Sequence, residues 1–248
     1  MAEHGEAAAG AATGAAAGGA AARGRGRPGR RRVLSEAEIL DAALGLLGEK
    51  GAEAVSVRGI AAAVGVAPNA VYTYFPDRAA LVGALVERIL GELDRAAFAD
   101  PGRPWRYRVH AVAAQLRERL MARPGAVDLL LFGPMDGPNA LALGETLLEI
   151  LAEAGLTTED AARASYLLIV QVLGFVALEA AEVDRAAPVP SEAERVAARA
   201  AALRAVPAEA YPRTAASAGT VARYVTGEQF RWGLDRVLDG LVAGRSVK

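Results

Sequence analysis

The chain has 248 residues, of which 53% are apolar, and a formal net charge of −1. This length suffices for two small helical domains or one large one. It contains no cysteine, which excludes disulfides, thiolate zinc sites and cysteine nucleophiles, and its only histidines are His4 and His110. A metal site or a Ser-His-Asp triad could therefore use only His110, so the composition argues against an enzyme and predicts no catalytic residues, metal or cofactor.

The composition predicts an all-α fold. Alanine and leucine dominate, aromatic residues make up 5%, and no β-branched run has the period of two that a strand would show. Residues 1–22 are almost entirely Ala, Gly and Glu and are predicted to be disordered, because they cannot bury enough apolar surface. This tail lacks the leucine-rich core of a secretory signal, and no uninterrupted, strongly apolar stretch of about 18 residues follows, so we expect a cytoplasmic protein without a membrane span.

An arginine-rich arm follows the tail. Six arginines lie within residues 23–32, spaced by Gly and Pro that forbid a helix, and Arg25-Gly26-Arg27-Pro28 resembles the AT-hook motif that binds the minor groove. The alternative is a nonspecific polybasic tail. Residues 23–78 carry nine basic and six acidic side chains, while residues 79–248 carry 19 and 21. The near-neutral total thus conceals a basic end.

Four helices are predicted in the first hundred residues. Ser35 and Glu38 form a capping box, and Ser56 and Asp77 are N-cap residues for later helices. The apolar periodicity that follows these caps predicts helices at 36–50, 57–64, 68–74 and 78–98.

The second and third of these helices form a predicted helix-turn-helix. Ala61, Gly65 and Val71 fall where a steep helix crossing needs a small residue, a left-handed turn residue and a buried branched residue. Gly65 can adopt a positive φ at little cost, and Pro68 suits the first helical position. Such a unit places its second helix in the major groove of DNA. On this pattern alone, an αα-hairpin within a helical bundle remains the alternative.

The residues after the third helix favour DNA binding. Tyr72-Thr73-Tyr74-Phe75 precedes the Asp77 cap and the Ala80-Leu81 pair, and here the chain resembles the tetracycline-repressor (TetR) family of transcriptional regulators. Residues 36–81 match the family's pattern. The resemblance implies an N-terminal three-helix DNA-binding domain and a C-terminal helical domain for effector binding and dimerisation. The implied divisions are 1–32 for the tail and arm, 33–88 for the helix-turn-helix domain and 89–248 for the C-terminal domain.

The resemblance also implies contacts to a double-stranded DNA operator. The amide of Asn69 is the best candidate for reading a base, because it can pair with an adenine edge. Tyr72 and Tyr74 could bind phosphate through their hydroxyls or pack on neighbouring helices, and both alternatives stay open. The family usually has Ser or Thr where this chain has Ala67. The predicted DNA-binding residues are Arg25, Arg27, Arg58, Pro68, Asn69, Ala70, Tyr72, Thr73, Tyr74 and Arg78.

The second half of the chain reads as a helical domain. Helices are predicted at 105–122, 126–132, 138–154, 159–183, 191–204 and 226–243, with a turn at 133–138 and a loop-rich stretch at 206–226. The segments 162–183 and 230–242 look like subunit-contact helices, although in a monomer both would be core. The segment 228–241 resembles the end of the C-terminal domain in TetR-like actinobacterial regulators, so a homodimer is predicted.

The effector pocket is harder to predict, because pocket walls and core use the same apolar residues. His110 could equally be a packed or surface histidine. Gln171 lies within an apolar run, and a buried amide needs a partner, which could be a ligand or another helix. The predicted ligand-binding residues are Trp105, His110, Phe132, Met135, Gln171 and Phe175.

The function predicted from these features is a sequence-specific transcriptional regulator, by family default a repressor, that an unknown small-molecule effector releases from its operator. The alternative is an architectural DNA-binding protein that relies on the arginine arm and has no effector. A small-molecule enzyme on a helical scaffold would lack a nucleophile, a base and an orienting group.

Overall fold

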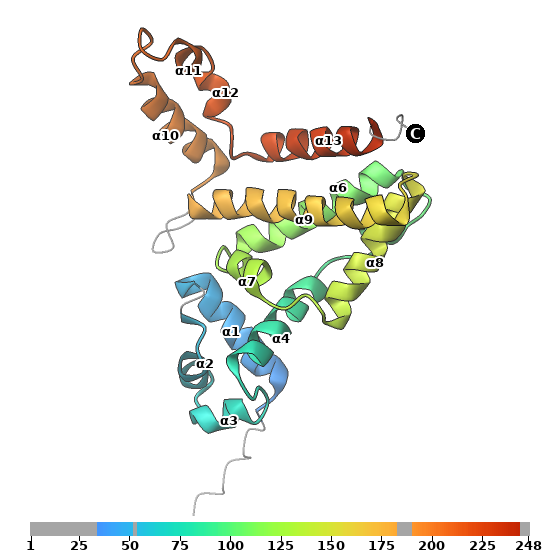
Figure 1. Cartoon of the computed structure of the whole chain (residues 1–248). Coiled ribbons are helices and arrows are strands. Elements are labelled where there is room, and N and C mark those ends of the chain that lie inside the picture. The colour runs from blue at the N-terminus through green and yellow to red at the C-terminus, as the bar shows by residue number, and fades with distance from the viewer. Residues whose placement is uncertain (1–33, 52–53, 183–189, 244–248) are drawn as a thin grey trace, which may run out of the picture. The chain divides into compact units, whose positions relative to one another are not determined.

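The computed structural model describes residues 34–51, 54–182 and 190–243. These residues form α-helices and short connections, with no strand among them, so the predicted all-α class is confirmed (Figure 1). The helices are α1 (Glu36–Lys50), α2 (Val57–Val64), α3 (Pro68–Tyr72), α4 (Arg78–Gly91), α5 (Ala96–Ala99), α6 (Trp105–Ala122), α7 (Ala126–Phe132), α8 (Pro138–Glu153), α9 (Thr158–Ala181), α10 (Glu192–Arg204), α11 (Pro212–Ala216), α12 (Ala218–Val221) and α13 (Gly227–Ala243).

The first helices begin where the predicted caps place them. The backbone N–H of Glu38 donates to Ser35 Oγ at 3.2 Å, and the Ser35 N–H donates to the Glu38 carboxylate at 3.0 Å, which completes the capping box of α1. Asp77 accepts from the N–H of Ala80 at 2.8 Å at the start of α4. Helix α1 packs on α2 and α4, and α2 packs on α3. The buried stripe of α1 is Ile39, Leu40, Ala43, Leu44 and Leu47.

Two predicted helix ends are wrong. Helix α3 ends at Tyr72 and not at residue 74, and α4 ends at Gly91 and not at Phe98. Beyond α4, the N–H of Asp94 donates to Gln115 Oε1 of α6 at 2.7 Å, and the Asp94 carboxylate accepts from the N–H of Ala96 at 3.0 Å. Local turn bonds from Glu92 and Leu93 end α4, a tertiary hydrogen bond holds the chain at Asp94, and a local one starts the short α5. The stretch 206–226, predicted to be loop-rich, contains α11 and α12.

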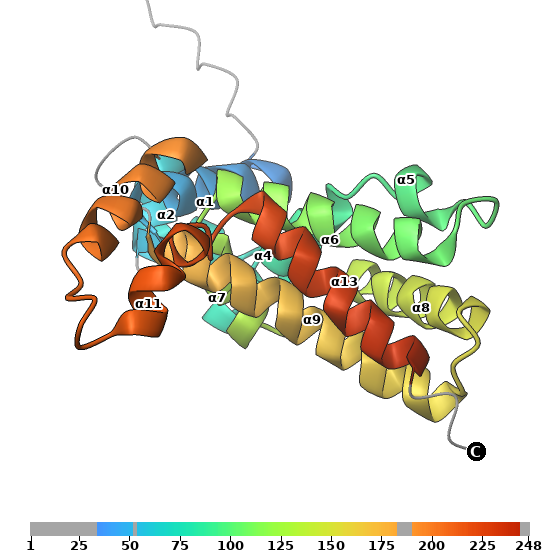
Figure 2. The same cartoon turned by 90° about the horizontal axis from the view of Figure 1, so that it is seen from above.

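Helices α6, α8 and α9 pack against one another and form the second part of the core. Helix α13 lies along α9 in both views and also contacts α6, while α4 contacts α7 and α8 (Figures 1 and 2). Helix α9 is long and apolar enough to cross a membrane by length and composition, but core helices of soluble proteins pass the same test. One face of it is buried at Leu168, Val172 and Val176.

A buried arginine ties three elements of this core together. Arg108 of α6 is 2% exposed, and its Nε donates to the carbonyl oxygen of Phe98 in α5 at 2.7 Å. Its Nη1 donates to the carboxylate of Glu153 at the end of α8 at 2.5 Å. A buried charge is tolerated only when it is paired and hydrogen-bonded, as it is here.

Replacing Arg108 by alanine should destabilise the protein. The Phe98 carbonyl would lose its side-chain donor and a void would form, so we expect the free energy of unfolding to fall by about 2–4 kcal/mol. Urea denaturation at fixed protein concentration measures this loss. The control is Arg163→Ala, because Arg163 pairs with Glu159 on the exposed surface of α9, where such pairs contribute about 0–1 kcal/mol. Equal losses for the two variants would contradict the assigned role of Arg108.

Candidate functional site

The helix-turn-helix is closed by its glycine turn. Gly65 adopts φ 73° and ψ 36°, the left-handed conformation that favours glycine, and its N–H donates to the carbonyl of Ala62 at 3.3 Å. The next N–H, of Val66, donates to Ala61 at 2.9 Å. Val71 of α3 is fully buried with Ile60 and Ala61 of α2. This packing fixes how α3 crosses α2 and leaves the opposite face of α3 in solvent.

Several of the predicted DNA-binding residues lie on the exposed face of α3 or directly after it. Pro68, Asn69, Tyr72 and Thr73 are exposed, whereas Ala70 is half-buried. The side-chain amide of Asn69 has no hydrogen-bond partner within the described residues, so it can bind an external group. Ala67 begins α3 without a side-chain cap, as the sequence predicts.

The two tyrosines differ in their surroundings. The hydroxyl of Tyr74 donates to the carbonyl of Leu34, immediately before α1. Tyr72 is half exposed, and it lines a surface depression together with Arg58 and Arg78, both of which are exposed. The structure thus brings Arg58, Tyr72 and Arg78 together and ties Tyr74 to the protein itself. Arg25 and Arg27 lie outside the described residues.

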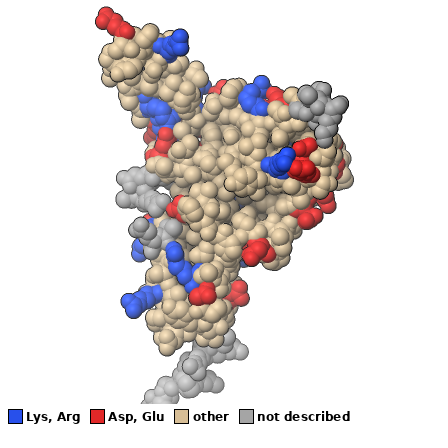
Figure 3. Space-filling model, in the orientation of Figure 1, with Lys and Arg blue, Asp and Glu red and all other residues tan. Residues whose placement is uncertain are grey.

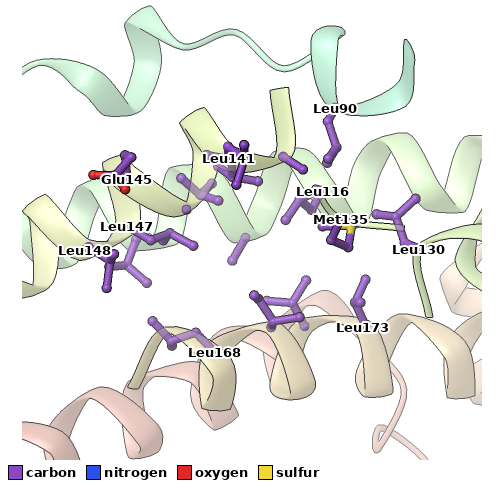
Figure 4. A pocket seen from close by; sticks show the side chains of 18 of the residues that line it. Leu90, Leu116, Leu130, Met135, Leu141, Glu145, Leu147, Leu148, Leu168 and Leu173 are labelled. Carbon is purple, nitrogen blue, oxygen red and sulfur yellow. The ribbon is translucent and has the colours of Figure 1, made fainter. Parts of the chain in front are cut away.

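A second candidate site is an apolar cavity of about 300 Å³ between α6, α8 and α9 (Figure 4). Helix α4 contributes Leu90 to it, α7 contributes Leu130, and α13 contributes Leu234. The volume lies at the lower end of the range for small-molecule sites. The wall residues from the three main helices are Val109, Val112, Ala113 and Leu116 of α6, Ala140, Leu141, Leu143, Gly144, Glu145, Leu147 and Leu148 of α8, and Leu168, Ile169, Val172 and Leu173 of α9.

Of the six predicted ligand-binding residues, the structure brings only Met135 to this cavity. His110 Nε2 lies 2.8 Å from the carboxylate of Asp235 on α13. Gln171 also faces α13, since a Cβ at Gly233 would lie 3.0 Å from its amide nitrogen. Phe132 is 86% exposed at the end of α7.

The two remaining candidates also lie away from the cavity. Trp105 is half-buried, and the guanidinium carbon of Arg106 lies 5.0 Å from the centroid of its ring. Phe175 packs edge-on against Phe230. The aliphatic wall could not be predicted from the sequence, because its leucines and valines carry no signal that separates a cavity from a filled core. No cluster of His, Cys, Asp or Glu that could hold a metal occurs in the part of the chain that the structure describes.

A carboxylate of α4 links the two candidate sites. Glu87 accepts from the backbone N–H of Asn139 at 2.6 Å and of Ala140 at 3.0 Å, at the start of α8. The Asn139 amide donates in return to the Glu87 carbonyl at 3.1 Å. The approach is close, because a Cβ on Gly137 would meet the Glu87 carboxyl carbon at 2.4 Å. Helix α8, a wall of the cavity, is thus fixed to the helix that follows the helix-turn-helix.

Comparison with known proteins agrees with both parts of this arrangement. Residues 39–85 match the family described as bacterial regulatory proteins, tetR family, and residues 98–244 match the tetracyclin repressor-like C-terminal domain. An HTH-type transcriptional regulator of Saccharopolyspora erythraea is 29% identical over 147 residues, which cover 59% of this chain and 61% of that protein. The chain therefore spans about three fifths of that relative's length.

Solved structures resemble the fold over more of the chain. A possible TetR family transcriptional regulator from Streptomyces coelicolor A3(2) has a TM-score of 0.71 and 30% identity, with 86% of this chain and 100% of that chain covered. The Streptomyces coelicolor TetR family protein ActR, in complex with actinorhodin, also has a TM-score of 0.71, at 24% identity, with 86% and 98% covered.

Proposed function

Because this chain belongs to the TetR family of bacterial transcriptional regulators, we propose that it binds operator DNA through α3 and leaves it when a small molecule fills the apolar cavity. Members of the family are DNA-binding transcription factors and not enzymes. The observation that carries the proposal is the position of α4, which contacts α1 on the DNA-binding side and α7 and α8 at the cavity. In this proposal residues 33–88 bind DNA and residues 89–248 bind the effector and form the dimer, with the boundary inside α4.

The DNA contacts in this proposal come from the exposed face of α3 and the neighbouring arginines. The free amide of Asn69 supports base reading in the major groove, and Arg58 with Arg78 supports binding to backbone phosphates. Tyr72, beside these arginines, is placed to donate its hydroxyl to a phosphate. The alternative of an architectural protein depends on Arg25 and Arg27, which lie outside the described residues, and it leaves the cavity without a role.

The two tyrosines give a matched test of the DNA interface. Tyr72→Phe should weaken operator binding by roughly 3- to 10-fold, the worth of one lost hydrogen bond, without changing stability. Tyr74→Phe should instead lower the free energy of unfolding by about 1 kcal/mol, because it removes the bond to the Leu34 carbonyl. Fluorescence anisotropy with duplex DNA from upstream of the gene, and urea denaturation, measure the two effects. A larger loss of DNA affinity in Tyr74→Phe than in Tyr72→Phe would reverse the assignment.

Coupling between cavity and DNA follows from the contact of α8 with α4. A ligand changes DNA affinity only if it binds two arrangements of the protein with different affinity. A molecule that spreads α6, α8 and α9 moves the N-terminus of α8, and Glu87 transmits that movement to α4. Helix α4 also packs on α1, with Arg88 paired to Asp41 at 3.0 Å at the surface of this contact, so a displacement of α4 reorients the helix-turn-helix.

A side chain built into the cavity should imitate the effector. Gly144 lines the cavity, and a Cβ added to it would meet no atom within 4 Å. Gly144→Leu should therefore fill the space and lower operator affinity by roughly 5- to 150-fold, the usual range of allosteric coupling. Glu118→Leu is the control, because Glu118 is exposed on α6 and does not line the cavity. DNA titration and urea denaturation of both variants check the effect.

Adding Glu87→Gln to Gly144→Leu should restore part of the lost operator affinity, since a neutral amide holds the α8 N-terminus less strongly. If Gly144→Leu folds normally and binds DNA like the unaltered protein, the cavity does not control DNA binding. If the double variant behaves like Gly144→Leu alone, coupling does not pass through Glu87.

We further propose that two copies associate through α9 and α13. Both helices expose large apolar side chains, which a monomer would leave in water: Tyr166, Leu167, Val170 and Leu178 on α9 and Trp232 on α13. Exposed apolar surface of this kind marks an association site. A dimer of identical subunits would present two copies of α3 to two half-sites of an operator.

Val170→Asp should shift the protein from dimer to monomer, because it places a charge in the centre of this apolar surface. Sedimentation equilibrium measures the association constant, and operator affinity should fall with it by at least about tenfold as the second half-site contact is lost. Tyr107→Asp is the control, since Tyr107 is exposed to a similar degree on α6. A dimer that survives Val170→Asp but dissociates in Tyr107→Asp would place the interface elsewhere.

A further inference from the structure

The side chains of the cavity wall are almost all of one chemical type. Among the described residues that line it, every side chain apart from the Met135 thioether and the Glu145 carboxylate is aliphatic or absent, and none is aromatic. Such a wall offers desolvation and dispersion to a hydrocarbon body, but neither stacking on a ring nor a hydrogen bond to a polar core. The occupant that this wall favours is therefore aliphatic.

Glu145 is the one ionisable residue among the described residues that line the cavity, and its exposed side chain marks one opening of the cavity to solvent, which we call the mouth. Figure 4 shows it at one end of the cavity, with Leu116, Met135 and Leu130 toward the other. Glu145 is exposed, as are Leu141 and Ile169, which lie beside the cavity on α8 and α9. Its carboxylate makes no ion pair or hydrogen bond with any residue that the structure describes.

The charged side chains of α8 are all acidic. Of its three glutamates, Glu153 is paired with Arg108, which leaves Glu145 and Glu149 beside the cavity. Glu149, like Glu145, is exposed and has no partner among the described residues. On α9, Arg163 is paired with Glu159 at 2.6 Å. Figure 3 shows acidic side chains on the side of the molecule that α8 forms. The field at the mouth therefore attracts cations and repels anions.

We propose that the cavity takes an aliphatic molecule with a single cationic group, such as an alkylammonium ion, and that Glu145 holds the charge at the mouth while the hydrocarbon enters between α6, α8 and α9. The charge stays outside because its transfer into an apolar cavity would cost far more than one ion pair returns. A volume of about 300 Å³ limits the body to a single short chain or a small ring system. This inference rests on the proposed role of the cavity as the effector site.

Three probes with the same hydrocarbon chain test the charge preference: octyltrimethylammonium, 1-octanol and octanoate. Each is titrated against the full chain by isothermal titration calorimetry. The ammonium should bind roughly 3- to 10-fold more tightly than the alcohol, as expected for a partly solvated ion pair, and octanoate should bind most weakly. The preference for the cation should shrink as salt is added.

Two isosteric variants assign the effect to one carboxylate. Glu145→Gln should remove the preference for the ammonium while the affinity for 1-octanol stays within about twofold, since only the charge is lost. Glu149→Gln, one turn further along α8 and outside the cavity lining, should keep most of the preference. Equal binding of ammonium and alcohol by the unaltered protein, or an unchanged preference in Glu145→Gln, overturns the inference.

Gly144→Leu and DNA titration separate this inference from the function on which it rests. Filling the cavity should abolish binding of all three probes. If the probes bind without charge preference and still lower operator affinity, the effector role stands and the cation inference fails. If the ammonium is preferred through Glu145 but leaves operator affinity unchanged, the inference stands and the proposed regulation fails. Failure of all three probes to bind the unaltered protein contradicts both.

Discussion

One carboxylate on α4 holds the N-terminus of α8, and the relation between the two candidate sites depends on it. The first N–H groups of a helix have no intrahelical acceptor, and their partial positive charge favours an anion. Glu87 supplies that anion to two of them, and Gly137 leaves the space for it. Because the same helix also packs on α1, the wall of the cavity and the frame of the helix-turn-helix contact one shared helix.

Helix α9 has two faces, one at the cavity and one at the surface of the protein. Its buried face, which includes Leu168 and Val172, closes the cavity, and its other face exposes Tyr166 and Val170. In the proposed dimer the second face would be covered by another copy, which accounts for a helix whose composition would otherwise suit a membrane. A ligand that displaces α9 would then act on the subunit contact as well as on α8. The distance between the two copies of α3 would respond to both displacements.

The cavity and its mouth have different physical roles. The aliphatic wall gives affinity that depends on buried area and tolerates many shapes, because it contains no directional group. Glu145, which has no partner among the described residues, makes the affinity depend on the charge of the ligand. Its carboxylate stays in contact with water, so this selection costs little desolvation free energy. The residues that bind the hydrocarbon and the residue that selects the charge of the ligand are therefore different, so substitutions can separate the two effects.

The sequence alone determined the features whose causes are local. The caps at Ser35, Ser56 and Asp77 and the left-handed turn at Gly65 depend on neighbouring backbone groups, so their residue types predicted where α1, α2 and α4 begin and how α2 meets α3. Only the tertiary structure decided the rest. The chain after α4 is held by a hydrogen bond from Asp94 to Gln115 of α6, and His110 and Gln171 face α13 rather than the cavity. The cavity could not be predicted at all, because a leucine that lines a void and a leucine that fills a core have the same periodicity, and only the packing of distant helices separates them.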